Sequence, residues 1–120
     1  MTASSWNPQA ALERVGHDQD LLQHMIMIFS EDAVPLLSQL RVQLQEQRLD
    51  EACRTAHSIK GLAMNFDGAQ CSSAAEQIEQ RCRANDRGDF EADLQQLAAS
   101  IQELSHELNV WKLSRDGRLP

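Results

Sequence analysis

The chain has 120 residues, a formal net charge of −7 and 42% hydrophobic residues. This length suits a single domain, residues 1–120, with a real core, and is too short for two independent domains. The acidic charge argues against nucleic acid and anionic membranes as partners. We expect a soluble, cytoplasmic protein, because the sequence has neither an apolar run of about 18 residues nor a basic N-terminal region before an apolar stretch.

Composition and periodicity indicate helices along the chain. Leucine, alanine, glutamine and glutamate are abundant, whereas glycine and proline are few and tyrosine is absent. Residues 1–8 are expected to be a tail that leads into a short helix over about 8–14. Asn7 suits the cap of that helix and Pro8 its first position. From Asp18 onward, apolar residues recur at three- and four-residue spacing, which predicts an amphipathic helix.

The segment that follows leaves two interpretations open. Residues 30–32, Ser-Glu-Asp, suit a helix N-terminus, and Pro35 would then lie near the first turn of a new helix that runs to about Gln47. Alternatively, one helix continues from Asp18 through a kink at Pro35. The sequence does not decide between these two arrangements.

Three further amphipathic segments complete the predicted fold. Apolar stripes cover about 49–66 and 69–85, separated by an Asp-Gly turn at 67–68, and a strict apolar heptad covers 90–111. Short loops between long helices favour antiparallel neighbours. The predicted fold is therefore all-α, an up-down-up-down antiparallel four-helix bundle with a short N-terminal helix, whose ordered core spans about 8–113 between frayed tails.

One histidine of the third helix stands out by its placement. At about 100° per residue, His57 lies roughly 130° from the centre of the buried stripe and points outward. Lys60 and Gly61, three and four residues later, share its face. A side chain at position 61 would lean over His57, and glycine has none. The imidazole is thus expected to have a cation beside it and open space above it, although glycine weakens the helix by about 1 kcal/mol.

An outward-facing histidine can be an inert surface residue, a metal ligand, a general base or a nucleophile. The spacing around His57 offers no second metal ligand, and no nucleophile with an oxyanion donor pair suggests acyl transfer. Nucleophilic histidine chemistry needs a free ring nitrogen, a group that fixes the tautomer, and a cation such as Lys60 for an anionic group. Haem ligation by Met25 and His106 lacks any supporting attachment sequence.

The run AHSIKGLAMNF at 56–66 resembles the signature of histidine phosphotransfer (HPt) domains. In that pattern the histidine is followed by any residue, an aliphatic residue, lysine and glycine, then small residues, a hydrophobic residue and a glycine. The resemblance extends over nearly the whole chain, because the segment 29–37 and the number of helices also fit. Two positions depart from it. Asp67 stands where members usually have glycine, and Met64 stands where smaller residues are common.

The resemblance implies that His57 is phosphorylated. Members of the family tend to carry Glu or Gln 22 residues after the histidine, here Glu79, whose carboxylate would accept from Nδ1–H and leave Nε2 free. The alternative for Glu79 is an ordinary solvated side chain. Arg83, one turn later, would contact phosphate or a partner, or form only a surface salt bridge. The expected partner-binding residues are Arg54, Gly61, Met64 and Arg83.

The resemblance also implies receiver domains as partners. A receiver phosphoaspartate, with its own Mg²⁺, would donate its phosphoryl group to His57, a second receiver aspartate would remove it, and Lys60 would offset the phosphoryl charge. The chain has no nucleotide-binding glycine loop and no carboxylate set for Mg²⁺. We therefore expect a monomeric phosphocarrier without autokinase activity, intrinsic cofactor or metal. The alternative is a helical adaptor that only binds proteins and in which His57 is inert.

Overall fold

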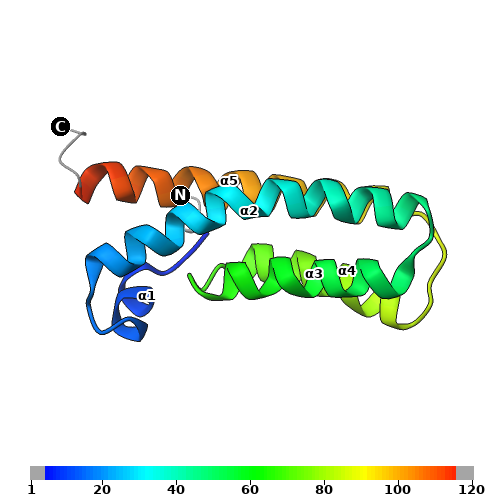
Figure 1. The fold of residues 1–120 in the computed structure, drawn as a ribbon, viewed down its shortest axis with the longest axis horizontal. Helices are drawn as coiled ribbons and strands as arrows, with labels where there is room; N and C mark the ends of the chain where they lie inside the picture. The colour runs from blue at the N-terminus through cyan, green and yellow to red at the C-terminus, as the bar shows by residue number, and fades with distance from the viewer. Residues whose placement is uncertain (1–4, 116–120) are drawn as a thin grey trace.

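The computed structural model describes residues 5–115, which form five helices and no β-strand. Helices α2 to α5 alternate in direction, with α3 packed against α2 and α4, and α5 packed against α4 and α2 (Figure 1). The predicted antiparallel bundle with a short N-terminal helix is confirmed. Much of the tail expected to fray after about residue 113 lies outside the described residues. The helices are α1 Pro8–Arg14, α2 Gln19–Gln45, α3 Leu49–Met64, α4 Ala69–Arg83 and α5 Glu91–Arg115.

Small side chains fill the interface between α3 and α4. Ala56 and Ala63 of α3 are fully buried, as is Ala75 of α4, and Cys71 of α4 is 1% exposed. Small residues at a helix contact let two backbones approach closely, since interhelical distance depends on the side chains between them. A longer side chain on the edge of α4 can therefore reach the outer face of α3.

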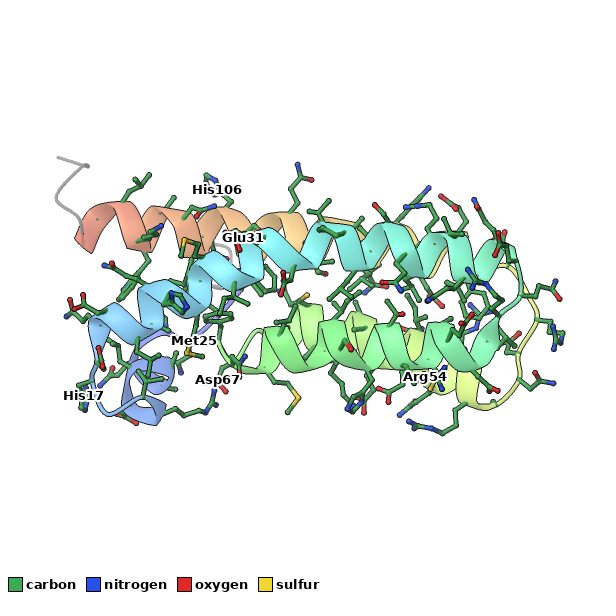
Figure 2. All side chains as sticks on the ribbon, in the orientation of Figure 1. His17, Met25, Glu31, Arg54, Asp67 and His106 are labelled. Carbon is green, nitrogen blue, oxygen red and sulfur yellow. The ribbon has the colours of Figure 1, made fainter. Side chains whose placement is uncertain are left out.

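Helix α2 runs without interruption past Pro35, which resolves the choice left open by the sequence. Its buried residues lie on both sides of the proline, with Phe29 before it and Leu40 after it. Pro35 lacks the N–H that would pair with the carbonyl of Glu31, one turn earlier, and proline at such a position kinks a helix. Figure 2 shows Glu31 where α2 changes direction. Helix α2 is therefore one bent helix, capped at its N-terminus by the Asp18 side chain, and not two separate helices.

The outer helices extend beyond the inner pair at one end of the bundle. Helices α2 and α5 have 27 and 25 residues, against 16 and 15 for α3 and α4. Helix α1 and residues 5–7 occupy this end (Figure 1). Residues 5–7 are not a tail, because Trp6 is buried and packs edge-to-face on Phe66 and Trp111, with ring centroids 6.0 and 5.9 Å away.

The turn between α3 and α4 is held from several sides. Helix α3 ends at Met64, and the following turn places Asp67 at a φ of 51°. Glycine, usual at this position in the family resembled, adopts such a φ most easily, and aspartate is among the residues that tolerate it. Arg14 of α1 donates to the Met64 carbonyl at 3.0 Å and pairs with the Asp67 carboxylate. Gly68 is buried against Leu104, which leaves no room for a side chain.

Across residues 5–115, no helix combines the length and the apolar character that a membrane span requires.

Candidate functional site

His57 lies in the middle of α3 with its side chain 65% exposed, as the helical phase predicts. Its Nδ1 lies 3.0 Å from Oε2 of Glu79 on α4. An ionised carboxylate can only accept a hydrogen bond, so Nδ1 carries the proton of the neutral ring. The lone pair of that tautomer is on Nε2. This arrangement leaves the unprotonated Nε2 as the ring nitrogen available for nucleophilic chemistry.

Glu79 is a buried carboxylate, not the solvated surface residue that was its alternative. Its side chain is only 3% exposed, and cations contact both oxygens: Lys60 Nζ lies 3.0 Å from Oε1, and Arg83 Nη2 lies 2.7 Å from Oε2. Burial alone would raise the pKa of Glu79, but the contacts with Lys60, His57 and Arg83 together lower it below its ordinary value. The carboxylate is therefore ionised at neutral pH.

Lys60 lies in the seam between α3 and α4. Its side chain is 20% exposed, with Nζ 3.0 Å from Glu79 and 3.9 Å from Oε1 of the exposed Glu76. Helical spacing predicts that Lys60 lies beside His57, but it does not predict the pairing of Lys60 with Glu79. That pairing follows from the close packing of the two helices, which no single-helix pattern reveals.

The face around His57 is open. A Cβ built at Gly61 would meet nothing within 4 Å, and the Met64 side chain is 55% exposed. Arg54 is exposed one turn before His57, on the α3 side of the bundle (Figure 2). The sequence alone does not assign any particular residue of α2 to this face. A groove runs between α2 and α3 beside Arg54, and the α2 residues that line it are Leu36, Gln39 and Gln43.

Arg83 is the member of the expected partner-binding set that is tied to the histidine's own partner. It is exposed at the end of α4, and its guanidinium shares Oε2 of Glu79 with His57. The structure therefore brings together His57, Lys60, Glu79 and Arg83 in one hydrogen-bonded and ion-paired group, which we call the His57 network. Arg54, Gly61 and Met64 lie on the adjacent α3 surface without joining it.

The two side chains considered as haem ligands are separated. Figure 2 shows His106 on the outer side of α5 and Met25 on the other side of α2. His106 is exposed, whereas Met25 is half-buried against the core. They do not face a common space in which a haem could bind both.

The family model for the Hpt domain matches residues 24–107 of the chain. Two solved structures share its fold. Histidine-containing phosphotransfer protein B (HptB) from Pseudomonas aeruginosa PAO1 has a TM-score of 0.85 and 17% identity, over 94% of this chain and 98% of that one. The HPT domain of the Hpt sensor hybrid histidine kinase from Shewanella has a TM-score of 0.76 and 14% identity, over 92% and 95%. No curated protein sequence matches the chain.

Proposed function

The chain belongs to the Hpt domain family, and from this premise we propose that it is a phosphorelay carrier that holds the phosphoryl group on Nε2 of His57. One observation carries the proposal: an exposed imidazole whose Nδ1 donates at 3.0 Å to a buried carboxylate. That contact assigns the proton to Nδ1 and the lone pair to Nε2. Histidine phosphotransfer needs an accessible nucleophilic nitrogen of this kind.

The proposed reaction is an in-line transfer from an acyl phosphate. The lone pair of Nε2 attacks phosphorus, an N–P bond forms, and the P–O bond to the donor aspartate breaks with its electron pair left on the carboxylate oxygen. The Nδ1 proton stays in place, so the phosphorylated ring gains positive charge. The Glu79 carboxylate lies against that proton and stabilises the charge that develops in the ring. Return of the phosphoryl group to a second aspartate reverses these steps.

Lys60 and Arg83 make the surroundings of the imidazole favourable to an anion. Each places a cation on one oxygen of Glu79, so the three charged groups together carry a net charge of +1 beside His57. An incoming phosphoryl group brings negative charge, which a preorganised positive site stabilises in the transition state. We propose that Lys60, one helical turn from His57, supplies most of this attraction.

Receiver domains are the proposed partners, both as donors and as acceptors. Their phosphoaspartate and its Mg²⁺ would meet His57 from the solvent side, over the open position of Gly61 and beside Arg54 and Met64. The metal belongs to the partner in this proposal. We further propose that the chain acts in the cytoplasm, as a monomer and without autokinase activity.

Transfer to His57 can be tested with receiver domains charged by acetyl phosphate. We expect the wild type to take up phosphate label from the receivers. This label should be labile in acid and stable in base, as on a phosphorylated histidine. The variant His57→Gln should take up no label. His106→Gln is the matched control, because it removes another exposed histidine from the distant helix α5 and should be labelled like the wild type. Label that persists in His57→Gln would contradict the assignment.

The adaptor alternative predicts binding without chemistry. It would be supported if receivers bound the wild type and His57→Gln equally while neither took up label. Binding by calorimetry and labelling on the same samples separate the two functions.

A further inference from the structure

Within the His57 network, the roles considered so far for Arg83 are positive charge near the imidazole and contact with phosphate or a partner, and none of them concerns the histidine tautomer. Arg83 follows Glu79 by one turn of α4, and its Nη2 lies 2.7 Å from Oε2. His57 Nδ1 lies 3.0 Å from that same oxygen. Lys60 contacts the other oxygen, at 3.0 Å. The oxygen that selects the histidine tautomer is therefore the one that Arg83 holds.

We propose that Arg83 is a positioning residue for phosphotransfer: it fixes Oε2 of Glu79 against Nδ1–H of His57, and so keeps Nε2 as the unprotonated, outward-facing nitrogen. This inference rests on the proposed function of His57. It assigns Arg83 a role within the isolated protein, before any partner binds.

An ordinary Glu–Arg pair one turn apart on a helix surface contributes little, because both side chains are solvated and mobile. The Glu79 carboxylate differs, since its side chain is 3% exposed and is directed across the seam toward α3. Without Arg83, a cation would hold only Oε1, and Oε2 would be held by the His57 Nδ1–H alone. A second donor on Oε2 restricts rotation about the terminal bond of Glu79, whose torsion has only a broad intrinsic preference. The Arg83 side chain itself is 66% exposed, so its replacement opens no cavity.

The charge of Glu79 also depends on Arg83. Burial raises the pKa of this carboxyl, and the contacts with Lys60, His57 and Arg83 lower it by more than burial raises it. The remaining nearby groups are Glu76 on α4, which faces Lys60, and Cys53 on α3, whose thiol donates to the Glu79 carbonyl. Without Arg83, Glu79 loses one of its two cations, and its pKa rises toward that of a buried acid. A protonated Glu79 would be a weaker acceptor for the hydrogen bond from Nδ1–H.

Substitutions at Arg83 test the proposal on the isolated protein. Arg83→Gln removes the charge and Arg83→Lys restores it. Arg87→Gln is the matched control, because Arg87 is an exposed arginine whose guanidinium donates to Gln47 at 2.8 Å. The imidazole ¹⁵N shifts of His57, recorded at pH 8, report the tautomer. We expect the Nδ1–H tautomer in the wild type, Arg83→Lys and Arg87→Gln, and a mixture with Nε2–H in Arg83→Gln.

The second readout is phosphorylation by phosphoramidate, a small donor whose P–N bond breaks with release of ammonia as the N–P bond to Nε2 forms. No receiver docks in this assay. By analogy with side chains that orient metal-bound histidines, whose loss lowers activity about 10- to 100-fold, we expect a loss on the order of 10-fold for Arg83→Gln. Arg83→Lys should recover most of the rate, and Arg87→Gln should match the wild type.

The outcomes separate positioning from docking. Arg83→Gln with the wild-type tautomer and phosphoramidate rate would overturn the proposal, and if receiver-dependent transfer alone then slowed, Arg83 would be a docking residue. Absence of label at His57 in the wild type, from phosphoramidate and from receivers alike, would instead overturn the proposed function on which the inference rests.

Discussion

At the scale of single residues, the chemistry of the site depends on one buried carboxylate. Glu79 accepts from His57, pairs with Lys60 and pairs with Arg83, and its side chain is 3% exposed. A buried charge is stable only when paired, so each partner holds the carboxylate in place and the carboxylate holds each partner. Lys60 is thereby bound at the seam between α3 and α4 before any phosphoryl group arrives.

Replacing Lys60 should affect both transfer and stability. In Lys60→Met, the buried Oε1 of Glu79 loses the cation that lies 3.0 Å away, and a buried charge deprived of such a partner costs about 1–3 kcal/mol. We expect urea unfolding at pH 7 to show a loss in this range, together with slower transfer from a charged receiver. The matched control is Glu76→Gln, which changes the more distant and exposed contact of Lys60, at 3.9 Å. A wild-type transfer rate in Lys60→Met would remove Lys60 from the mechanism.

The stability of the protein should vary with pH through Glu79. Its folded-state pKa lies below the ordinary value of 4.5, so the ionised form stabilises the fold above about that pH. This contribution is lost as pH falls through the folded-state pKa. In Glu79→Gln the contribution is absent at every pH. Thermal unfolding between pH 7 and pH 3 should therefore show a stability difference between the two proteins that shrinks below pH 4.5, and a constant difference would contradict this.

The sequence predicts the parts of the site that lie on one helix. His57, Lys60 and Gly61 share a face because three- and four-residue spacings do so in any α-helix. Glu79 could be named only from the family spacing, since its contact crosses from α4 to α3. The pairing of Lys60 and Arg83 with separate oxygens of Glu79 depends on how closely two helices approach, which helical periodicity does not determine.

At the scale of elements, two glycines near the end of α3 have different reasons to be glycine. Gly61 lies within the helix, where a Cβ would meet nothing within 4 Å. Gly68 is the N-cap residue just before α4, where a Cβ would lie 2.9 Å from Leu104 Cδ2 and 3.1 Å from the Ala63 carbonyl oxygen. The protein's own packing thus requires glycine at position 68 but not at position 61. If glycine is needed at position 61, the need would come from the receiver domain that docks over His57.

The same substitution at these two positions should have opposite effects on stability. Gly61→Ala should stabilise the protein by up to about 1 kcal/mol, because alanine is the better helix former. Gly68→Ala should destabilise it by about 1–3 kcal/mol through overpacking against Leu104. Urea unfolding of the pair measures both, and equal effects would contradict the packing argument.

Gly61 also allows a test of clearance above His57. In Gly61→Glu a long acidic side chain would lean over the ring and repel the phosphoryl group, so transfer from a receiver should be blocked while the helix stays folded. Circular dichroism provides the control for folding. Unimpaired transfer would show that the open position is not needed.

Helix α2 shows why short sequence signals for a helix start can misplace the boundary between helices. Ser30 and the acidic residues after it suit a helix start, and Pro35 suits a first turn. The apolar face nevertheless continues on both sides of Pro35, from Phe29 to Leu40, and both residues are fully buried. Burial of that continuous face outweighs the hydrogen bond that proline removes. The effect of Pro35 on α2 is therefore a bend near Glu31 and not a break (Figure 2).

At the scale of the whole molecule, the bundle has helices of unequal length, and the N-terminal segment fills the difference. Helices α2 and α5 extend beyond α3 and α4, and α1 with residues 5–7 occupies the space that remains at that end (Figure 1). Trp6 could not be assigned to the core from sequence, because it precedes the first periodic segment and its neighbours Phe66 and Trp111 are distant in the chain.

The position of Trp6 predicts that the segment before α1 stabilises the bundle without taking part in transfer. Trp6 is 5% exposed between two aromatic rings, and removal of a buried tryptophan side chain typically costs about 3–5 kcal/mol. We expect Trp6→Ala to unfold at much lower urea concentration, with a wild-type transfer rate per folded molecule under conditions that keep it folded. Val110→Ala, a truncation of an exposed side chain near Trp6, should change stability by no more than about 0.5 kcal/mol. Equal stability of the two variants would mean that Trp6 contributes no more than a surface residue, and that the bundle is complete without the segment before α1.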